Sequence, residues 1–233
     1  YKTPIVPTKP LKFGTAVIWI CFGMGLCVIA NAGTSFLVAF FKNLGITLTQ
    51  GDVAKPNSIF ECILDIIGIA IVPAICEEFA MRCCALGLLK NYGKAFGVVS
   101  VSVVFGLLHG NVIQFIFAFL VGLVLAYITI KTESIIPAMC IHALNNGMSA
   151  VSDTVNYAAG KEVNVTVGFF AFWLLVGIIA TIYLAIKHKL TIPKDDGNCV
   201  LTLGEKVSSF FFPGMILPFI VLIIMTAQTV KIG

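Results

Sequence analysis

Charged side chains are scarce in this sequence. Lys, Arg, Asp and Glu make up 11% of its 233 residues, whereas soluble domains contain about 25%. Hydrophobic residues make up 59%, and the mean hydropathy is +1.03. This composition excludes a water-soluble domain and predicts an integral membrane protein.

Other common sequence features are also missing. There are no internal repeats, heptads or low-complexity tracts, and the eight cysteines include no C-x-x-C pair. Most of these cysteines fall in apolar segments, where a thiol behaves as a small apolar side chain, so we expect no disulfide framework and no cysteine zinc site. The sequence starts at Tyr1 without a cleavable signal pattern, which indicates a trimmed chain.

Long apolar runs predict an all-α, polytopic bundle of about seven transmembrane helices. The spans are expected near 13–41, 59–89, 95–109, 112–130, 134–152, 165–186 and 208–230. The second is too long for a straight span, so we expect its start to lie along the interface. The length suits a single membrane domain, 1–233, with no sizeable part outside the membrane.

The lysines predict the orientation in the cell membrane. With a cytoplasmic N-terminus and an external C-terminus, the outer segments hold four lysines and the inner segments hold the other ten: Lys2, Lys9, Lys12, Lys90, Lys94, Lys131, Lys187, Lys189, Lys194 and Lys206. This is a clear positive-inside bias. The net charge of +4 then reflects topology, and we expect the lipid bilayer, not a nucleic acid, as partner.

A few ionisable residues lie inside the predicted spans. A charge at the bilayer centre costs roughly 2.5–3.5 kcal/mol, so such residues are candidates for function by default. The stretch "ICEEFAMRCC" (75–84) contains Glu77, Glu78 and Arg82. Glu78 and Arg82 are four residues apart and are expected to form an ion pair, whereas Glu77 points about 100° away and needs another partner.

The partner of Glu77 is predicted to lie on other spans. His109 ends the third span, and His142 and Asn146 share one face of the fifth because they are four residues apart. A rise of about 1.5 Å per residue brings all three to a depth similar to that of Glu77. We therefore expect one polar site at membrane depth.

Neighbouring residues support a wet site. Pro73 and Pro137 precede candidate residues on their helices, and each is expected to open its helix locally. Gly106 and Gly110 should permit close approach or a turn. Other polar residues are explained by structure and not by function. Asn31 and Gln114 are expected to form interhelical hydrogen bonds, and Glu61 and Asp65 are expected to lie at a wet interface.

Three motifs carry a family resemblance. "EEFAMR" (77–82) fits E-E-x-x-x-R, "FGLLH" (105–109) fits F-x-x-x-H, and "HALNN" (142–146) fits H-x-x-x-N. In this order, on successive spans, they resemble the CAAX-prenyl-protease and bacteriocin-processing (CPBP, or Abi) family of intramembrane endopeptidases. The resemblance covers about residues 59–150, and every motif position is kept.

The resemblance implies hydrolysis of a peptide bond in a hydrophobic or membrane-tethered peptide. Glu77, as general base, and His109 would hold and deprotonate a water. His142 and Asn146 would donate hydrogen bonds to the oxyanion. The neighbouring Glu–Arg pair would fix the helix and the local potential.

A zinc-dependent version of the same protease stays open. Glu77, His109 and His142 would then be the ligands, with water in the fourth position. The sequence has no H-E-x-x-H helix, and Asn146 suits an oxyanion donor better than a ligand. We therefore favour a mechanism without a cofactor.

Functions of other classes also stay open. Intramembrane Glu, Arg and His residues mark relays in small transporters, but no inverted repeat is visible. A catalytically idle bacteriocin-immunity protein would not need Glu77 together with both histidines.

Overall fold

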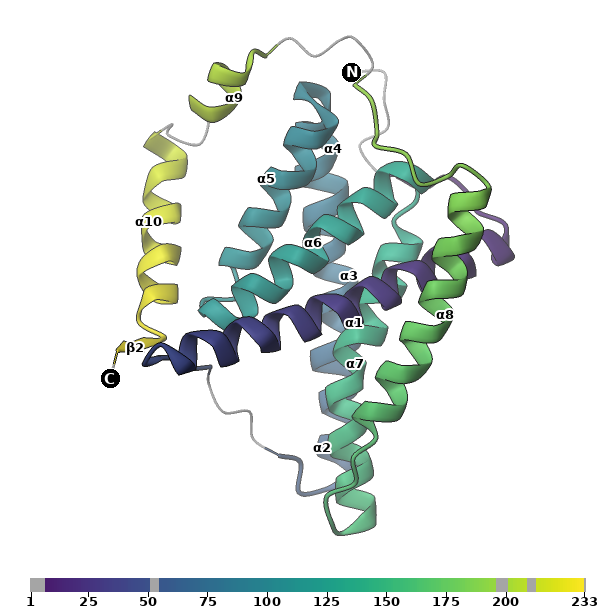
Figure 1. The fold of residues 1–233 in the computed structure, drawn as a ribbon, viewed down its shortest axis with the longest axis vertical. Helices are drawn as coiled ribbons and strands as arrows, with labels where there is room; N and C mark the ends of the chain where they lie inside the picture. Colours follow the sequence, from purple (N-terminus) through teal and green to yellow (C-terminus); the bar gives the residue numbers. More distant parts are fainter. Residues whose placement is uncertain (1–6, 51–54, 196–200, 209–212, 233) are drawn as a thin grey trace.

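The protein is an all-α bundle. The computed structural model describes residues 7–50, 55–195, 201–208 and 213–232. Its long helices are α1 (Phe13–Asn43), a continuous helix Ile59–Tyr92, α5 (Lys94–Leu107), α6 (Val112–Thr132), α7 (Ile136–Ala159), α8 (Thr166–Ile186) and α10 (Pro213–Ala227), and α9 (Leu203–Ser208) is short. Figure 1 shows α1 running obliquely across α6 and α7, with α10 along one edge.

The predicted fold class is confirmed, and each predicted span coincides largely with one helix. Among the described residues, four helices are long and apolar enough to cross a membrane: α1, the 59–92 helix, α6 and α8. Helices α5 and α10, with 14 and 15 residues, are shorter than a full span. Part of the last predicted span, 209–212, lies outside the described residues. The count of seven stays a prediction.

The 59–92 helix is not regular along its length. It consists of α2 (Ile59–Asp65), the π-helical η1 (Ile66–Ile71), α3 (Val72–Glu78), the π-helical η2 (Phe79–Ala85), α4 (Leu86–Leu89) and the 3₁₀ turn η3 (Lys90–Tyr92). Its start resembles a capping box with the second bond displaced by one residue: Glu61 N–H donates to Ser58 Oγ at 3.2 Å, and the Glu61 carboxylate accepts from Asn57 N–H, one residue before the cap, at 2.6 Å. The carboxylate expected to need only a wet interface therefore caps a helix.

The two prolines behave differently. Pro73 is the second residue after η1, and Val72 N–H, just before it, donates five residues back, to Ile67 O. The expected local opening near Pro73 is confirmed. The same expectation for Pro137 is wrong, because Pro137 lies in the first turn of α7, where its missing N–H leaves no bond unmade.

Close packing around α1 and α6 forms the core. Trp19, Met24 and Cys27 of α1 are buried with Leu125 and Ile128 of α6 in one apolar cluster. Helix α1 also approaches α8 closely, because a Cβ at Gly25 would lie 2.8 Å from Gly177 Cα. This packing holds α6 and α7 in place behind the polar residues described below.

Segments predicted on the cytoplasmic side lie together at one end of the bundle. Lys9 forms an ion pair with Glu133 at 2.8 Å. Lys94 N–H donates to the Asp195 carboxylate at 2.6 Å, and Lys131 Nζ donates to Thr191 at 2.6 Å. The N-terminal segment, two helix connections and the long polar loop are thus gathered as predicted.

The segments predicted outside contact one another at the opposite end. Strands β1 (Ile46–Leu48) and β2 (Val230–Ile232) pair antiparallel, Val112 N–H donates to Thr229 Oγ1 at 3.2 Å, and Lys55 pairs with Glu162 at 3.2 Å. This grouping agrees with the predicted connectivity. Which end faces the cytoplasm stays a prediction.

Candidate functional site

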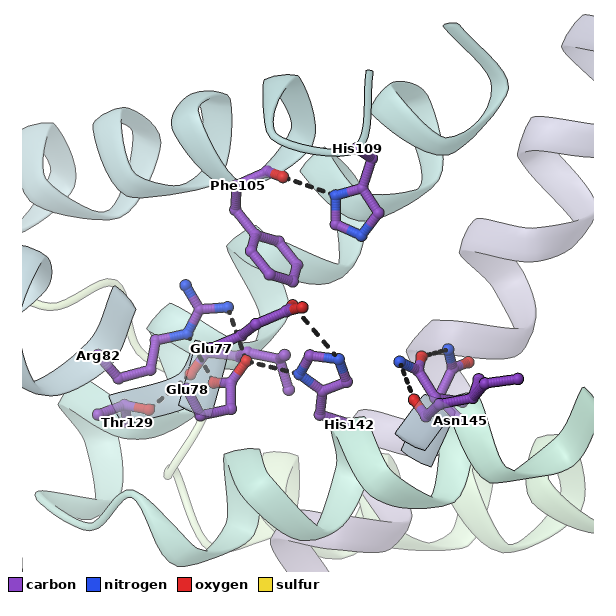
Figure 2. A network of polar contacts seen from close by, with 11 residues as sticks. Glu77, Glu78, Arg82, Phe105, His109, Thr129, His142 and Asn145 are labelled. Carbon is purple, nitrogen blue, oxygen red and sulfur yellow. Dashed lines mark hydrogen bonds and ion pairs between the residues drawn. The ribbon is translucent and has the colours of Figure 1, made fainter. Parts of the chain in front are cut away.

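Helices α3, η2, α5 and α7 bring the predicted site residues together (Figure 2). Adjacent Glu77 and Glu78 end α3, Arg82 follows on η2, His109 comes directly after α5, and His142 lies on α7. From matching depth we expected a carboxylate, two imidazoles and a carboxamide to meet. Glu77 and His109 line one cavity and His142 Nε2 lies 3.9 Å from Glu77, whereas Asn146 contacts Ile69 O.

Glu78 is a fully buried hydrogen-bond acceptor. Arg82 Nε donates to Glu78 Oε2 at 2.9 Å and Arg82 Nη2 to Oε1 at 3.4 Å, so the predicted ion pair is confirmed. His142 Nδ1 also contacts Glu78 Oε1 at 2.9 Å. Because an ionised carboxylate only accepts, Nδ1 carries the proton. The ring therefore presents Nε2 toward Glu77, whose Oε2 lies 3.9 Å away.

The contact between His142 and Glu78 was not predicted. The two residues are 64 positions apart, and matching depths cannot show which of two adjacent carboxylates faces a second helix. The rotation of α3 decides this, and that rotation depends on packing and on the π-helical turns beside it.

Phe105 packs at the centre of the cluster. Its ring meets those of His109 and His142 edge-on, at centroid distances of 5.1 and 5.8 Å, and the Arg82 guanidinium lies 5.2 Å from its centroid. Phe105 thus makes a cation–π contact with Arg82 and separates it from His109. Phe105 belongs to the F-x-x-x-H motif but was not predicted to lie in the site. Its spacing of four residues from His109 was a signal for this contact.

His109 is held by its own helix. Its Nδ1 donates to Phe105 O at 2.8 Å, which leaves the lone pair of Nε2 available. The turn after it uses Gly110, whose φ is +68°. A Cβ at Gly106 would lie 2.9 Å from Phe115 O, so only glycine permits this approach of α5 to α6. The predicted roles of both glycines are confirmed.

Glu77 faces a different space from Glu78. Its side chain is 43% exposed and lines, together with His109, a cavity of about 290 Å³. The other lining residues are mostly apolar: Cys76, Ala80, Met81, Phe105 and Leu108. The predicted divergence of the two carboxylates is confirmed, and Glu77 has its neighbours on other helices.

Asn146 ties α7 to the 59–92 helix. Its Nδ2 donates to Ile69 O at 3.2 Å, and its Oδ1 accepts from Asn145 Nδ2 at 3.3 Å. In an α-helix Ile69 O would accept from residue 73, but Pro73 has no N–H. Asn146 therefore supplies a donor to a carbonyl whose α-helical donor position is a proline. An amide nitrogen has two N–H groups, so one remains for another acceptor.

Two predicted interhelical hydrogen bonds are wrong. Gln114 bonds locally with Asn111, whose Oδ1 caps α6 by accepting from Gln114 N–H at 2.8 Å. Asn31 has no hydrogen-bond partner among the described residues and lines a second cavity. Neither side chain bridges two helices: Gln114 is satisfied locally by Asn111, and Asn31 faces the second cavity.

The zinc alternative has no preassembled group of ligands in the described part of the chain. The part of the chain that the structure describes contains no group of three or more His, Cys, Asp or Glu side chains that could hold a metal ion. Each imidazole does donate from Nδ1 to a carboxylate or carbonyl, as metal-bound histidines do. The choice between zinc and a mechanism without a cofactor stays a prediction.

Comparison with known proteins identifies the segment that carries the site. Residues 59–148 match the family model described as type II CAAX prenyl endopeptidase Rce1-like. This segment is Rce1-like. It contains all three motifs, so the predicted resemblance to CPBP-family endopeptidases is confirmed. Searches of curated proteins and of solved structures found no match.

Proposed function

We propose that this chain is an intramembrane endopeptidase that hydrolyses a peptide bond in a hydrophobic or membrane-tethered peptide. One observation carries the proposal: Glu77 and His109 come from different helices and line one cavity, within an Rce1-like segment. A carboxylate and an imidazole with a free lone pair are the groups that activate water.

Glu77 and His109 act on the same water molecule in different ways. His109 donates from Nδ1 to Phe105 O, so Nε2 accepts one hydrogen of the water while Glu77 accepts the other. The water oxygen attacks the peptide carbonyl carbon as Glu77 takes a proton. When the C–N bond breaks, Glu77 returns that proton to the leaving amine.

His142 and Asn146 stabilise the negative oxygen of the tetrahedral intermediate. Since His142 Nδ1–H is bonded to Glu78, Nε2 donates only when the ring is an imidazolium. Because Glu77 is protonated in the intermediate, the positive charges of Arg82 and His142 then balance the negative charges of Glu78 and the oxyanion. Asn146 contributes the N–H that it does not use on Ile69 O.

The surroundings of the cavity favour an apolar substrate. Phe79 and Leu108, beside the site, have 50% and 55% of their surface exposed, and at membrane depth such side chains face lipid. A peptide already in the bilayer can therefore approach Glu77 from that side. A prenylated C-terminal peptide, as in the family's description, belongs to this class.

Cleavage of peptides by the purified full-length chain tests the proposal. Hydrophobic and prenylated peptides are incubated with protein in liposomes, and the products are analysed by mass spectrometry. We expect two fragments whose summed mass exceeds that of the substrate by one water. Solute flux without cleavage of any peptide would instead support a transporter and contradict the proposal.

A further inference from the structure

A second cavity lies farther along α7, toward the end of the helix at Ala159. It has a volume of about 340 Å³, is open at one side and is lined by residues of α1, α6, α7 and α8. Six of its nine lining residues are polar: Asn31, Asn145, Ser149, Ser152, Asp153 and Thr166. We call it the α7 cavity, because α7 contributes most of these residues.

The α7 cavity continues a polar face that begins at the candidate site. Starting from His142, polar residues follow at spacings of three and four, which places them on one side of the helix: Asn145, Asn146, Ser149, Ser152 and Asp153. At about 1.5 Å per residue, Asp153 lies roughly 16 Å beyond His142, toward the end of α7 at Ala159.

Two of the lining groups need water. In the part of the chain that the structure describes, Asp153 has no ion-pair partner and Asn31 has no hydrogen-bond partner. A carboxylate or amide left without partners in an apolar medium costs several kcal/mol. The α7 cavity is therefore a place for water. It begins near Asp153, just beyond the predicted span 134–152, and extends toward membrane depth, where polar side chains line aqueous space.

Asn145 connects this cavity to the site. It lines the α7 cavity, and its Nδ2 donates to Asn146, one helical turn from His142. Figure 2 shows Asn145 and His142 following one another along α7. The cavity at Glu77, in contrast, is bordered mainly by apolar residues. Lipid on that side cannot supply the water that each hydrolysis consumes.

We propose that the α7 cavity is the route by which water reaches Glu77 and His109 from the end of the bundle where α7 ends. This inference rests on the proposed hydrolysis. It assigns the two cavities to the two reactants, with peptide on the lipid side of Glu77 and water along the polar face of α7.

Thiol accessibility tests whether the α7 cavity holds water. Ser152→Cys lines the cavity, and Val151→Cys is the matched control because Val151 is adjacent, points about 100° away from Ser152 around the helix and is 47% exposed, toward lipid. Each full-length variant in liposomes is treated with a charged, water-soluble thiol reagent, and labelled positions are assigned by peptide mass spectrometry. We expect labelling at 152 and little at 151. Labelling at 152 no faster than at 151 overturns the proposal.

Filling the cavity tests whether its water is used. The double variant Ser149→Leu/Ser152→Leu should lose most of kcat for peptide cleavage with KM unchanged, whereas Val151→Leu should behave like the parent. An unchanged kcat in a folded double variant, checked by thermal unfolding in detergent, overturns the route. If the parent cleaves no peptide, the proposed function fails but the labelling result still stands, so the two failures are distinguishable.

Discussion

At the scale of single residues, Glu77 and Glu78 differ in what they contact. Glu78 is fully buried and accepts hydrogen bonds from Arg82 and His142. Glu77 is 43% exposed and borders a cavity. A turn of about 100° between neighbouring helical positions is enough to separate the two environments. Glu78 therefore orients and balances charge, and Glu77 is free to react.

Arg82→Ala should lower the stability of the protein. It leaves Glu78 buried without its cation, and breaking a buried pair typically costs about 3–5 kcal/mol. The double variant Glu78→Gln/Arg82→Gln removes both charges and should recover much of the loss. Thermal unfolding in detergent measures both. If Arg82→Ala unfolds at the parental temperature, the buried ion pair is not a structural requirement.

Chelation separates the two forms of protease chemistry. If Glu77 and His109 activate water without a metal, strong chelators should leave peptide cleavage unchanged, and metal analysis should find no stoichiometric zinc. Activity lost on chelation and restored by zinc would contradict this chemistry, while Glu77, His109 and His142 would remain the site.

At the scale of helices, the contact between Asn146 and Ile69 O joins α7 to the π-helical turn before Pro73. Asn146 thus has two roles, one in holding the helices together and one proposed in catalysis. The two roles can be tested separately, because residue 73, the position that would donate to Ile69 O in an α-helix, is a proline and can be replaced.

Asn146→Ala should reduce both stability and peptide cleavage. The unpaired carbonyl costs about 1–3 kcal/mol, and loss of an oxyanion donor costs about 10²–10³ in rate. Adding Pro73→Ala restores an N–H for Ile69 O. We expect the double variant to regain thermal stability but not activity. Recovery of both would assign Asn146 a structural role alone.

Much of this arrangement was predictable from the sequence. The helices follow from long apolar runs, and the site residues follow from the cost of placing charge in lipid. The contact of Glu78 with His142 was not predictable, because it depends on how α3 is rotated. Gln114 was wrongly predicted to bridge two helices, because it bonds locally with Asn111. Pro137 was wrongly predicted to open its helix, because it lies in the first turn of α7. The cap formed by Ser58 and Glu61 was a readable signal that was missed.

At the scale of the whole molecule, contacts place the N-terminal segment and the C-terminal strand β2 at opposite ends of the bundle (Figure 1). The inner group contains Lys9, Lys94 and Lys131, and the outer group contains Lys55 and the β1–β2 pair. Contacts define the two groups, and only the lysine bias indicates which of them is cytoplasmic.

Reporter fusions or cysteine accessibility at positions 50, 160 and 195 test the orientation. We expect 50 and 160 to report the outside and 195 the cytoplasm, because lysine-rich connections stay inside. The same side for 160 and 195 would show that α8 does not cross the membrane. Reversed sides at all three positions would contradict the predicted orientation while leaving the fold intact.

The most direct measurement of the central claim is peptide cleavage by Glu77→Gln. This change keeps the volume and a hydrogen-bonding group but removes the base, so the variant should fold like the parent. The matched control Glu61→Gln changes a carboxylate at the start of the same long helix, far from the cavity. We predict that Glu77→Gln loses nearly all cleavage while the control retains it. Cleavage by Glu77→Gln at near the parental rate would show that Glu77 is not the catalytic base.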